Sequence, residues 1–224
     1  VTGALTAVTG SPFVAGTSPR AVAVDPNSRF AYVANEGSNN VSAFTIESAS
    51  GALTAVAGSP VAAGTGPKGV GVDPSGRFVY VANAGSNNVS MFAINGVSGA
   101  LTSSGSPMAA GTSPVSVAVD PTGRWAYVAN AGSNNLSVFS INRTSGLLTA
   151  AAGSPVVTGA SPRAVTVDPA GRVVYVVNGT SNDVSVFTID GTTGALTLLG
   201  SPVAAGTTPV SIAVDPTGRW AYVV

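Results

Sequence analysis

The chain of 224 residues is apolar and nearly uncharged: 45% of its residues are hydrophobic, 8% are charged, and nine basic residues balance nine acidic ones. This balance excludes the basic footprint of a nucleic-acid-binding protein and the polybasic cluster of a membrane-surface protein. Because the chain has no Cys and no His, disulfides, thiolate chemistry and the usual proton shuttle at neutral pH are excluded. We expect a folded domain with no cofactor, no metal, no nucleic-acid partner and no membrane insertion.

A repeat of 47–48 residues runs through the whole chain. GALT or GLLT begins at residues 3, 51, 99, 146 and 194, and YVANAGSNN occurs at 80–88 and again, letter for letter, at 127–135. Self-similarity at such a period indicates a repeat architecture. We interpret residues 1-224 as one domain built of the units 3-50, 51-98, 99-145, 146-193 and the partial unit 194-224.

Each unit contains four stretches of strand length. In the second unit they read LTAVAGSPVAAG, GVGVDP, RFVYVANAG and NNVSMFAIN, separated by Gly, Pro, Ser and Asn. Four antiparallel strands in about 47 residues are typical of a β-propeller blade, and a solenoid is the alternative. The predicted fold is therefore an all-β propeller of four complete blades plus partial strands at both ends, from the fourth-strand sequence GALTAVTGSP to the second-strand sequence WAYVV.

An Asp-Pro turn precedes the second strand of every unit. Asp at the first position and Pro at the second are the preferences of a type I turn. We expect the carboxylate to cap its own turn and the Arg four residues later to bond across the hairpin or with the next blade. Since each carboxylate belongs to a different blade, the pattern predicts no metal site. The five turns span 25–29, 73–77, 120–124, 168–172 and 215–219.

Aromatic residues recur in register, which favours a core between blades over a ligand cage. In the second strand, the aromatic at the start and the Tyr two residues later point to the same face. We predict that this face packs against the neighbouring unit. The three repeated positions are Tyr32, Tyr80, Tyr127, Tyr175 and Tyr222; Phe30, Phe78, Trp125 and Trp220; and Phe44, Phe92, Phe139 and Phe187.

The segments YVAN at 32–35, 80–83 and 127–130, and YVVN at 175–178, are each followed by Ser-Asn and a V-S-x-F or L-S-x-F strand. They resemble the YVTN-type propeller repeats of prokaryotic surface and secreted proteins, and are similar to the seven-bladed lactonase-like family that includes 6-phosphogluconolactonase. The resemblance implies an extracellular, periplasmic or cell-surface location. Because the chain opens on a fourth-strand sequence and stops after a second-strand sequence, we expect it to be part of a longer seven-bladed ring of roughly 330 residues, with a half that self-associates through open strand edges as the alternative.

One position varies in charge while its surroundings do not. It follows the Pro that precedes each first strand and is occupied by Arg20, Lys68, Val115, Arg163 and Val210. The innermost strand of a propeller borders the central channel, so we expect Arg20, Lys68 and Arg163 at a channel mouth. There they would form a partial cationic ring for a carboxylate or phosphate; ordinary solvated surface charge is the alternative.

Glu36 is the one carboxylate at the first position of the Asn-rich loop between the second and third strands. The equivalent residues are Ala84, Ala131 and Gly179. Glu36 is thus the single candidate base, and we group it with the three cations as a candidate ligand-binding set. The Asn residues of this loop are interpreted as turn-forming, with presentation of amides to a glycan or peptide as the alternative.

Two functions of different classes fit this sequence. The first is a non-catalytic secreted or cell-surface propeller, a rigid binding or structural module for a protein, a glycan or a small anionic ligand at the channel mouth. The alternative is a lactonase-like hydrolase for a small lactone or sugar lactone, in which a base activates water and Arg and Lys stabilise the oxyanion. Because few residues interrupt the blade pattern, we favour the first and assign no catalytic residue. Such similar blades also fit an engineered repeat or recent duplication.

Overall fold

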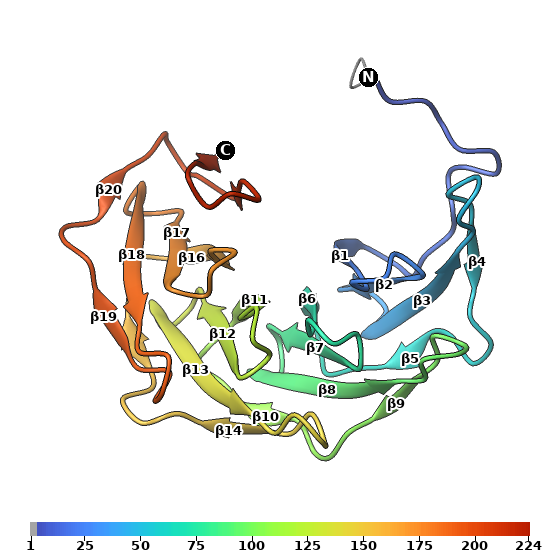
Figure 1. The fold of residues 1–224 in the computed structure, drawn as a ribbon, viewed down its shortest axis with the longest axis horizontal. Coiled ribbons are helices and arrows are strands. Elements are labelled where there is room, and N and C mark those ends of the chain that lie inside the picture. The colour runs from blue at the N-terminus through green and yellow to red at the C-terminus, as the bar shows by residue number, and fades with distance from the viewer. Residues whose placement is uncertain (1–3) are drawn as a thin grey trace.

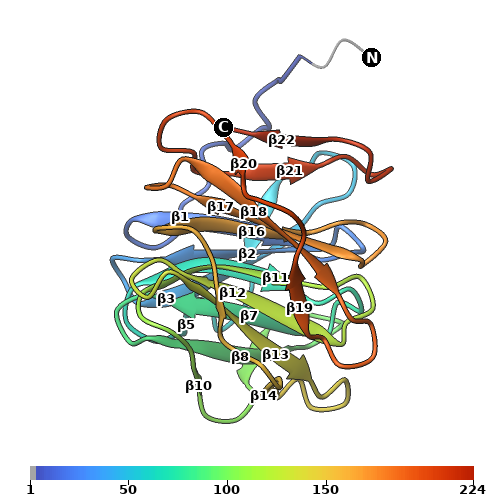
Figure 2. The same ribbon diagram turned by 90° about the vertical axis from the view of Figure 1, so that its left-hand side faces the viewer.

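The computed structural model describes residues 4–224 as β-strands joined by turns and loops. Four five-stranded antiparallel sheets and one two-stranded sheet follow one another along an arc, which is open between the first sheet and the two-stranded sheet (Figure 1). Figure 2 shows the same arc turned by 90°. The first strands of successive sheets contact one another, β1 with β6, β6 with β11 and β11 with β16. They therefore line the inner side of the arc, as in a propeller.

The strands of the sheets have closely similar bounds. The first two sheets contain β1 (Pro19–Val24), β2 (Phe30–Asn35), β3 (Asn40–Ile46), β4 (Leu53–Ala55) and β5 (Val61–Ala62), then β6 (Pro67–Val72), β7 (Phe78–Asn83), β8 (Asn88–Ile94), β9 (Leu101–Ser103) and β10 (Met108–Ala109). The next two contain β11 (Pro114–Val119), β12 (Trp125–Asn130), β13 (Asn135–Ile141), β14 (Leu148–Ala150) and β15 (Val156–Val157), then β16 (Pro162–Val167), β17 (Val173–Asn178), β18 (Asp183–Ile189), β19 (Leu196–Leu198) and β20 (Val203–Ala204). The last sheet pairs β21 (Ile212–Val214) with β22 (Ala221–Val223).

The fourth strand of each blade is split into two short strands, where the sequence pattern predicts a single one. In the first sheet both pieces, β4 and β5, pair with β3. Between them the chain turns through Gly58, which has a positive φ of 83°. The Ala43 amide donates instead to Ser59 Oγ at 2.8 Å, so a side chain satisfies the backbone group that an unbroken strand would satisfy.

The opening fourth-strand sequence does not form a strand in the part of it that the structure describes, residues 4–12. The same sequence in the later units pairs with a third strand of its own sheet. Here the nearest third strand, β3, already pairs with β2, β4 and β5. The expected strand at this end is therefore absent because no ladder is available to it.

The core lies between the sheets, as the in-register aromatics predict. Phe30 and Tyr32 of the first sheet pack with Val79, Val81 and Phe92 of the second in one buried cluster. Two further clusters join the second sheet to the third and the third to the fourth. The stacking of neighbouring units, which buries one face of each sheet, is the main source of stability in such an architecture.

Glycine in the GALT sequence is required by this packing. Gly146 has a φ of 74°, and a Cβ on it would collide with the ring of Phe78 in the preceding sheet. The Tyr80 hydroxyl donates to the carbonyl of the same glycine at 3.0 Å. The turn at Gly146 thus contacts both Phe78 and Tyr80 of the preceding sheet. A larger residue at this position would separate the two sheets.

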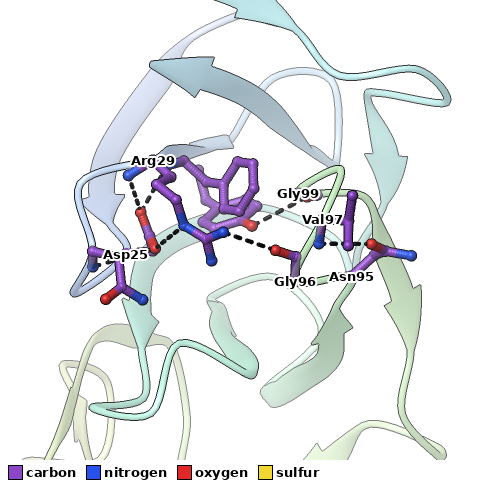
Figure 3. A network of polar contacts seen from close by, with 9 residues as sticks. Asp25, Arg29, Asn95, Gly96, Val97 and Gly99 are labelled. Atoms are coloured by element: carbon purple, nitrogen blue, oxygen red, sulfur yellow. Dashed lines mark hydrogen bonds and ion pairs between the residues drawn. The ribbon is translucent and has the colours of Figure 1, made fainter. Parts of the chain in front are cut away.

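The first Asp-Pro turn behaves as predicted (Figure 3). Asp25 Oδ1 accepts hydrogen bonds from the amides of Arg29 and Phe30 at 2.6 and 2.7 Å. The Arg29 guanidinium then donates to the Gly96 carbonyl of the next sheet at 2.9 Å. The carboxylate therefore caps its own turn, and the Arg bonds with the next blade.

Candidate functional site

The position that varies in charge is a β-bulge. In each of the four large sheets the register of the first strand shifts across one residue, between Pro19 and Ala21 in the first sheet. The residue before the Pro that begins each first strand has a positive φ, for example 51° at Ser18 and 54° at Ser161. A bulge inserts an extra residue and redirects its side chain, which frees that residue from the in-and-out alternation of the strand. The bulge residues are Arg20, Lys68, Val115 and Arg163.

Three of the four candidate residues come together. Glu36 Oε2 accepts a hydrogen bond from Arg20 Nε in the same sheet, and Glu36 Oε1 lies 3.3 Å from Lys68 Nζ in the next sheet. The Glu36 side chain is 25% exposed and that of Arg20 is 57% exposed. Glu36 thus joins the rims of two sheets, and the group carries one net positive charge.

The cations around Glu36 determine its acidity. The hydrogen bond from Arg20, reinforced by that from Lys68 and by both charges, lowers the pKa of the carboxyl below its usual value despite some desolvation. A carboxylate with a lowered pKa is a weak base, and this one already accepts from two cations. The geometry therefore makes Glu36 an organiser of Arg20 and Lys68 rather than a proton acceptor.

Arg163 occupies the same bulge in the fourth sheet but has different surroundings. Gly179 stands where Glu36 does in the first sheet, and a Cβ on it would lie 2.8 Å from Arg163 Cγ. The guanidinium therefore lies over a glycine and not over a carboxylate. Among residues 4–224 no ion pair involves Arg163, so it does not share the ion pairs of Glu36 with Arg20 and Lys68. The four residues share one rim without forming one cluster.

The Asn-rich loop holds adjacent sheets together. Asn39 has a φ of 55° and accepts a hydrogen bond from the Gly66 amide of the next sheet at 2.8 Å. Asn87 makes the same bond with the Ser113 amide at 2.8 Å. The bonds repeat for Asn134 with Ser161 and for Asn182 with Thr208. These residues are thus turn-forming and structural, as the sequence indicates.

Tyrosine hydroxyls and clustered acidic side chains, two kinds of group that catalysis commonly uses, add no further candidate site in the described part of the chain. Burial raises the pKa of Tyr32, Tyr80 and Tyr127, which keeps these hydroxyls neutral. Across residues 4–224, no three acidic side chains lie close enough to hold a metal ion together. The same residues contain no helix with the length and apolarity needed to cross a membrane.

The sequence matches the family described as "Lactonase, 7-bladed beta-propeller" over residues 1–161 and 119–214. The chain belongs to this lactonase family. No curated protein matches it. Because the matched ranges cover almost the whole chain, the family resemblance of the YVAN-type repeats is confirmed, and so is the β-propeller fold.

Solved structures with the same architecture have diverse descriptions. The periplasmic gluconolactonase of Pseudomonas aeruginosa is 24% identical with a TM-score of 0.74, over 92% of this chain and 56% of that one. The hydrazine synthase of Kuenenia stuttgartiensis is 21% identical with a TM-score of 0.74, over 97% and 58%. A functionally unknown protein of Desulfotomaculum acetoxidans is 17% identical with a TM-score of 0.79, over 95% and 64%. This lactonase-family chain spans less than two thirds of each structure, and the likeness shows the fold alone.

Proposed function

We propose that this member of the lactonase family is a non-catalytic binding module whose rim of bulge residues binds a small organic anion. The proposal is based on the bulge position, where three of the four large sheets have a cation and the remaining one has Val. Most other repeated polar side chains instead make hydrogen bonds within or between the sheets. The proposed location is extracellular, periplasmic or at the cell surface. The YVTN-type repeats support it, as does the periplasmic location stated for the Pseudomonas aeruginosa gluconolactonase.

Binding of gluconate, measured by isothermal titration calorimetry, tests this proposal. The chain provides its own matched variants, because Val occupies the same bulge in other units. We expect Arg163→Val, which removes the cation that lacks a carboxylate partner, to weaken binding about tenfold or more, as loss of a charge-assisted hydrogen bond does. Arg143→Gly on the opposite rim is the control. Equal affinity of Arg163→Val and the unmodified chain would contradict the proposal.

A lactonase-like hydrolase for a small lactone or sugar lactone is the second candidate. Family membership favours it, and Arg20 and Lys68 could stabilise the oxyanion that forms when water attacks a lactone carbonyl. The lowered pKa of Glu36 argues against the hydrolase, since a general base works best with a pKa near the operating pH.

Hydrolysis of glucono-δ-lactone distinguishes the two candidates. The binding module should hydrolyse it no faster than buffer does between pH 6 and pH 8, a range of about two units around neutrality in which a catalytic base is normally active. A saturable rate that disappears in both Glu36→Ala and Arg20→Ala would establish the hydrolase instead.

A further inference from the structure

A cleft of about 320 Å³ lies on the rim opposite the bulge residues, between the second and third sheets. Arg77 lines it from the Asp-Pro turn of the second sheet, and Arg143 and Thr144 from the β13–β14 turn of the third. Ser75 and Thr122 complete its polar wall. Two arginines and three hydroxyl-bearing residues therefore line one space that is separate from the proposed binding rim.

Arg143 interrupts the repeat in the same way as the bulge cations do. The residues at its position in the other three turns are Ser48, Gly96 and Gly191. The sequence pattern contains this signal, although the partner that gives it meaning, Arg77, is 66 residues away. Structural comparison of the turns therefore identifies a residue that the sequence analysis missed.

The cleft has a net positive charge, because two arginines and one carboxylate line it. Its only carboxylate, Asp73, is buried, and Oδ1 accepts from the amides of Arg77 and Phe78 at 2.7 Å each. Oδ2 accepts from the Ser75 amide at 3.1 Å and from the Ser75 hydroxyl. In the described residues no ion pair involves Arg77 or Arg143, whereas Arg29 of the first sheet lies 3.9 Å from Asp25.

The guanidinium of Arg77 is positioned but not saturated. Arg77 Nε donates to Ser75 Oγ at 3.0 Å, and Nη2 donates to the Arg143 carbonyl. A guanidinium has five N–H donors, so three remain. Arg143 also lines a second cleft, of about 460 Å³, which it shares with Arg124. Arg77, Arg124 and Arg143 thus line the two clefts beside the β13–β14 turn.

We propose that this arginine cleft binds the phosphate group of a small phosphate monoester. A guanidinium matches phosphate in a two-bond fork, and a dianionic group with three free oxygens can be shared between Arg77 and Arg143. A carboxylate presents two oxygens and one charge, which a single guanidinium satisfies. The volume accommodates a molecule of a few carbon atoms beyond the phosphate.

Calorimetric titration of the full chain with glycerol 3-phosphate tests this inference, with glycerol and glycerate as matched ligands. We expect saturable binding of the phosphate that weakens as salt is added, and no binding of glycerol. Arg143→Gly, which installs the residue of two other turns, should weaken binding at least tenfold. Arg143→Lys should restore part of the affinity, since it keeps the charge without the fork.

Variants on the other rim separate this site from the proposed function. The titrations are therefore made in the Arg20→Val, Arg163→Val background, in which the bulge rim has lost two of its cations and the cleft residues are unchanged, so that failure of one proposal does not entail failure of the other. In that background, undetectable binding of glycerol 3-phosphate, equal binding of glycerate, or full affinity after the additional Arg143→Gly substitution would each overturn the phosphate site.

Discussion

At the scale of single residues, identical side chains at identical repeat positions have different environments, and this provides built-in controls. Tyr80 is completely buried between sheets, whereas Tyr222 at the same repeat position is 62% exposed. The hydroxyl of Tyr80 is also hydrogen-bonded to the next sheet. The contribution of a residue to stability is therefore set by the neighbouring sheet and not by its repeat position.

Truncation of these two tyrosines measures that difference. Tyr80→Ala should lower the free energy of unfolding by about 3–5 kcal/mol, because it removes a ring from a packed core and leaves a cavity. Tyr222→Ala should lower it by less than about 1 kcal/mol, as expected for an exposed side chain. Urea titrations of both variants at low protein concentration give the comparison. Equal losses would show that the aromatic face does not form the core.

The ion-paired Glu36 gives a prediction with a defined pH dependence. Its pKa is lowered in the folded chain, so its contribution to stability is present above the pKa of the unfolded chain and is lost as the pH falls through the folded value. The difference in unfolding free energy between the unmodified chain and Glu36→Gln should be at most about 1 kcal/mol at neutral pH. It should vanish as the pH decreases below about 4.3, the usual value for Glu.

Urea titrations of Glu36→Gln and the unmodified chain over a pH series provide this measurement. Added salt should reduce the difference at neutral pH, because the pair is partly exposed. A difference that increases on acidification would have the opposite sign and would contradict the ion-paired assignment.

At the scale of turns and strands, the turn between the third and fourth strands of a sheet packs against the preceding sheet at its GALT or GLLT glycine. Gly146 combines a φ of 74° with contact against Phe78, whereas Gly191 has neither a positive φ nor an atom within 4 Å of its Cβ position. Gly146→Ala should therefore destabilise the chain by about 2 kcal/mol or more, through backbone strain and steric overlap. Gly191→Ala should change the stability by less than about 0.5 kcal/mol.

Thermal unfolding of these two variants, followed by circular dichroism, is sufficient to compare them. Both substitutions add the same methyl group to turns of the same kind, so differences in helix or strand propensity do not contribute. Similar melting temperatures for Gly146→Ala and Gly191→Ala would mean that the sheets tolerate separation at this turn.

These elements also show how far sequence alone is informative. The period, the Asp caps and the aromatic core follow from the sequence because each repeat recreates the same local surroundings. Contacts between sheets do not follow the repeat period. Arg29 bonds to Gly96 and Tyr32 to Gly99, each pair 67 residues apart, which is one repeat period plus the distance between two different positions of the repeat. That additional distance depends on how blades stack, so the pairing of Glu36 with Lys68 and the Arg77–Arg143 cleft could not be predicted.

At the scale of the whole molecule, the arc exposes surfaces that are buried between its own sheets. Trp220 is 61% exposed, and β22 pairs only with β21, so its other edge has unpaired backbone groups. At the same repeat positions Phe78 and Trp125 are buried against the following sheet. An unpaired edge next to exposed aromatic surface is a template for strand addition by another chain.

We therefore expect the 224-residue chain to self-associate in a concentration-dependent manner through β22 and its aromatic face. Size-exclusion chromatography with light scattering, over about a hundredfold range of protein concentration, measures the mass directly. Trp220→Ser together with Tyr222→Ser should shift the equilibrium towards one chain, because the doubly substituted face no longer offers apolar area to a partner. Val97→Ser, at a side chain that is 92% exposed in a turn of the second sheet, is the control and should not change the mass. A mass equal to one chain at every concentration would show that water satisfies this edge well enough to keep the arc monomeric.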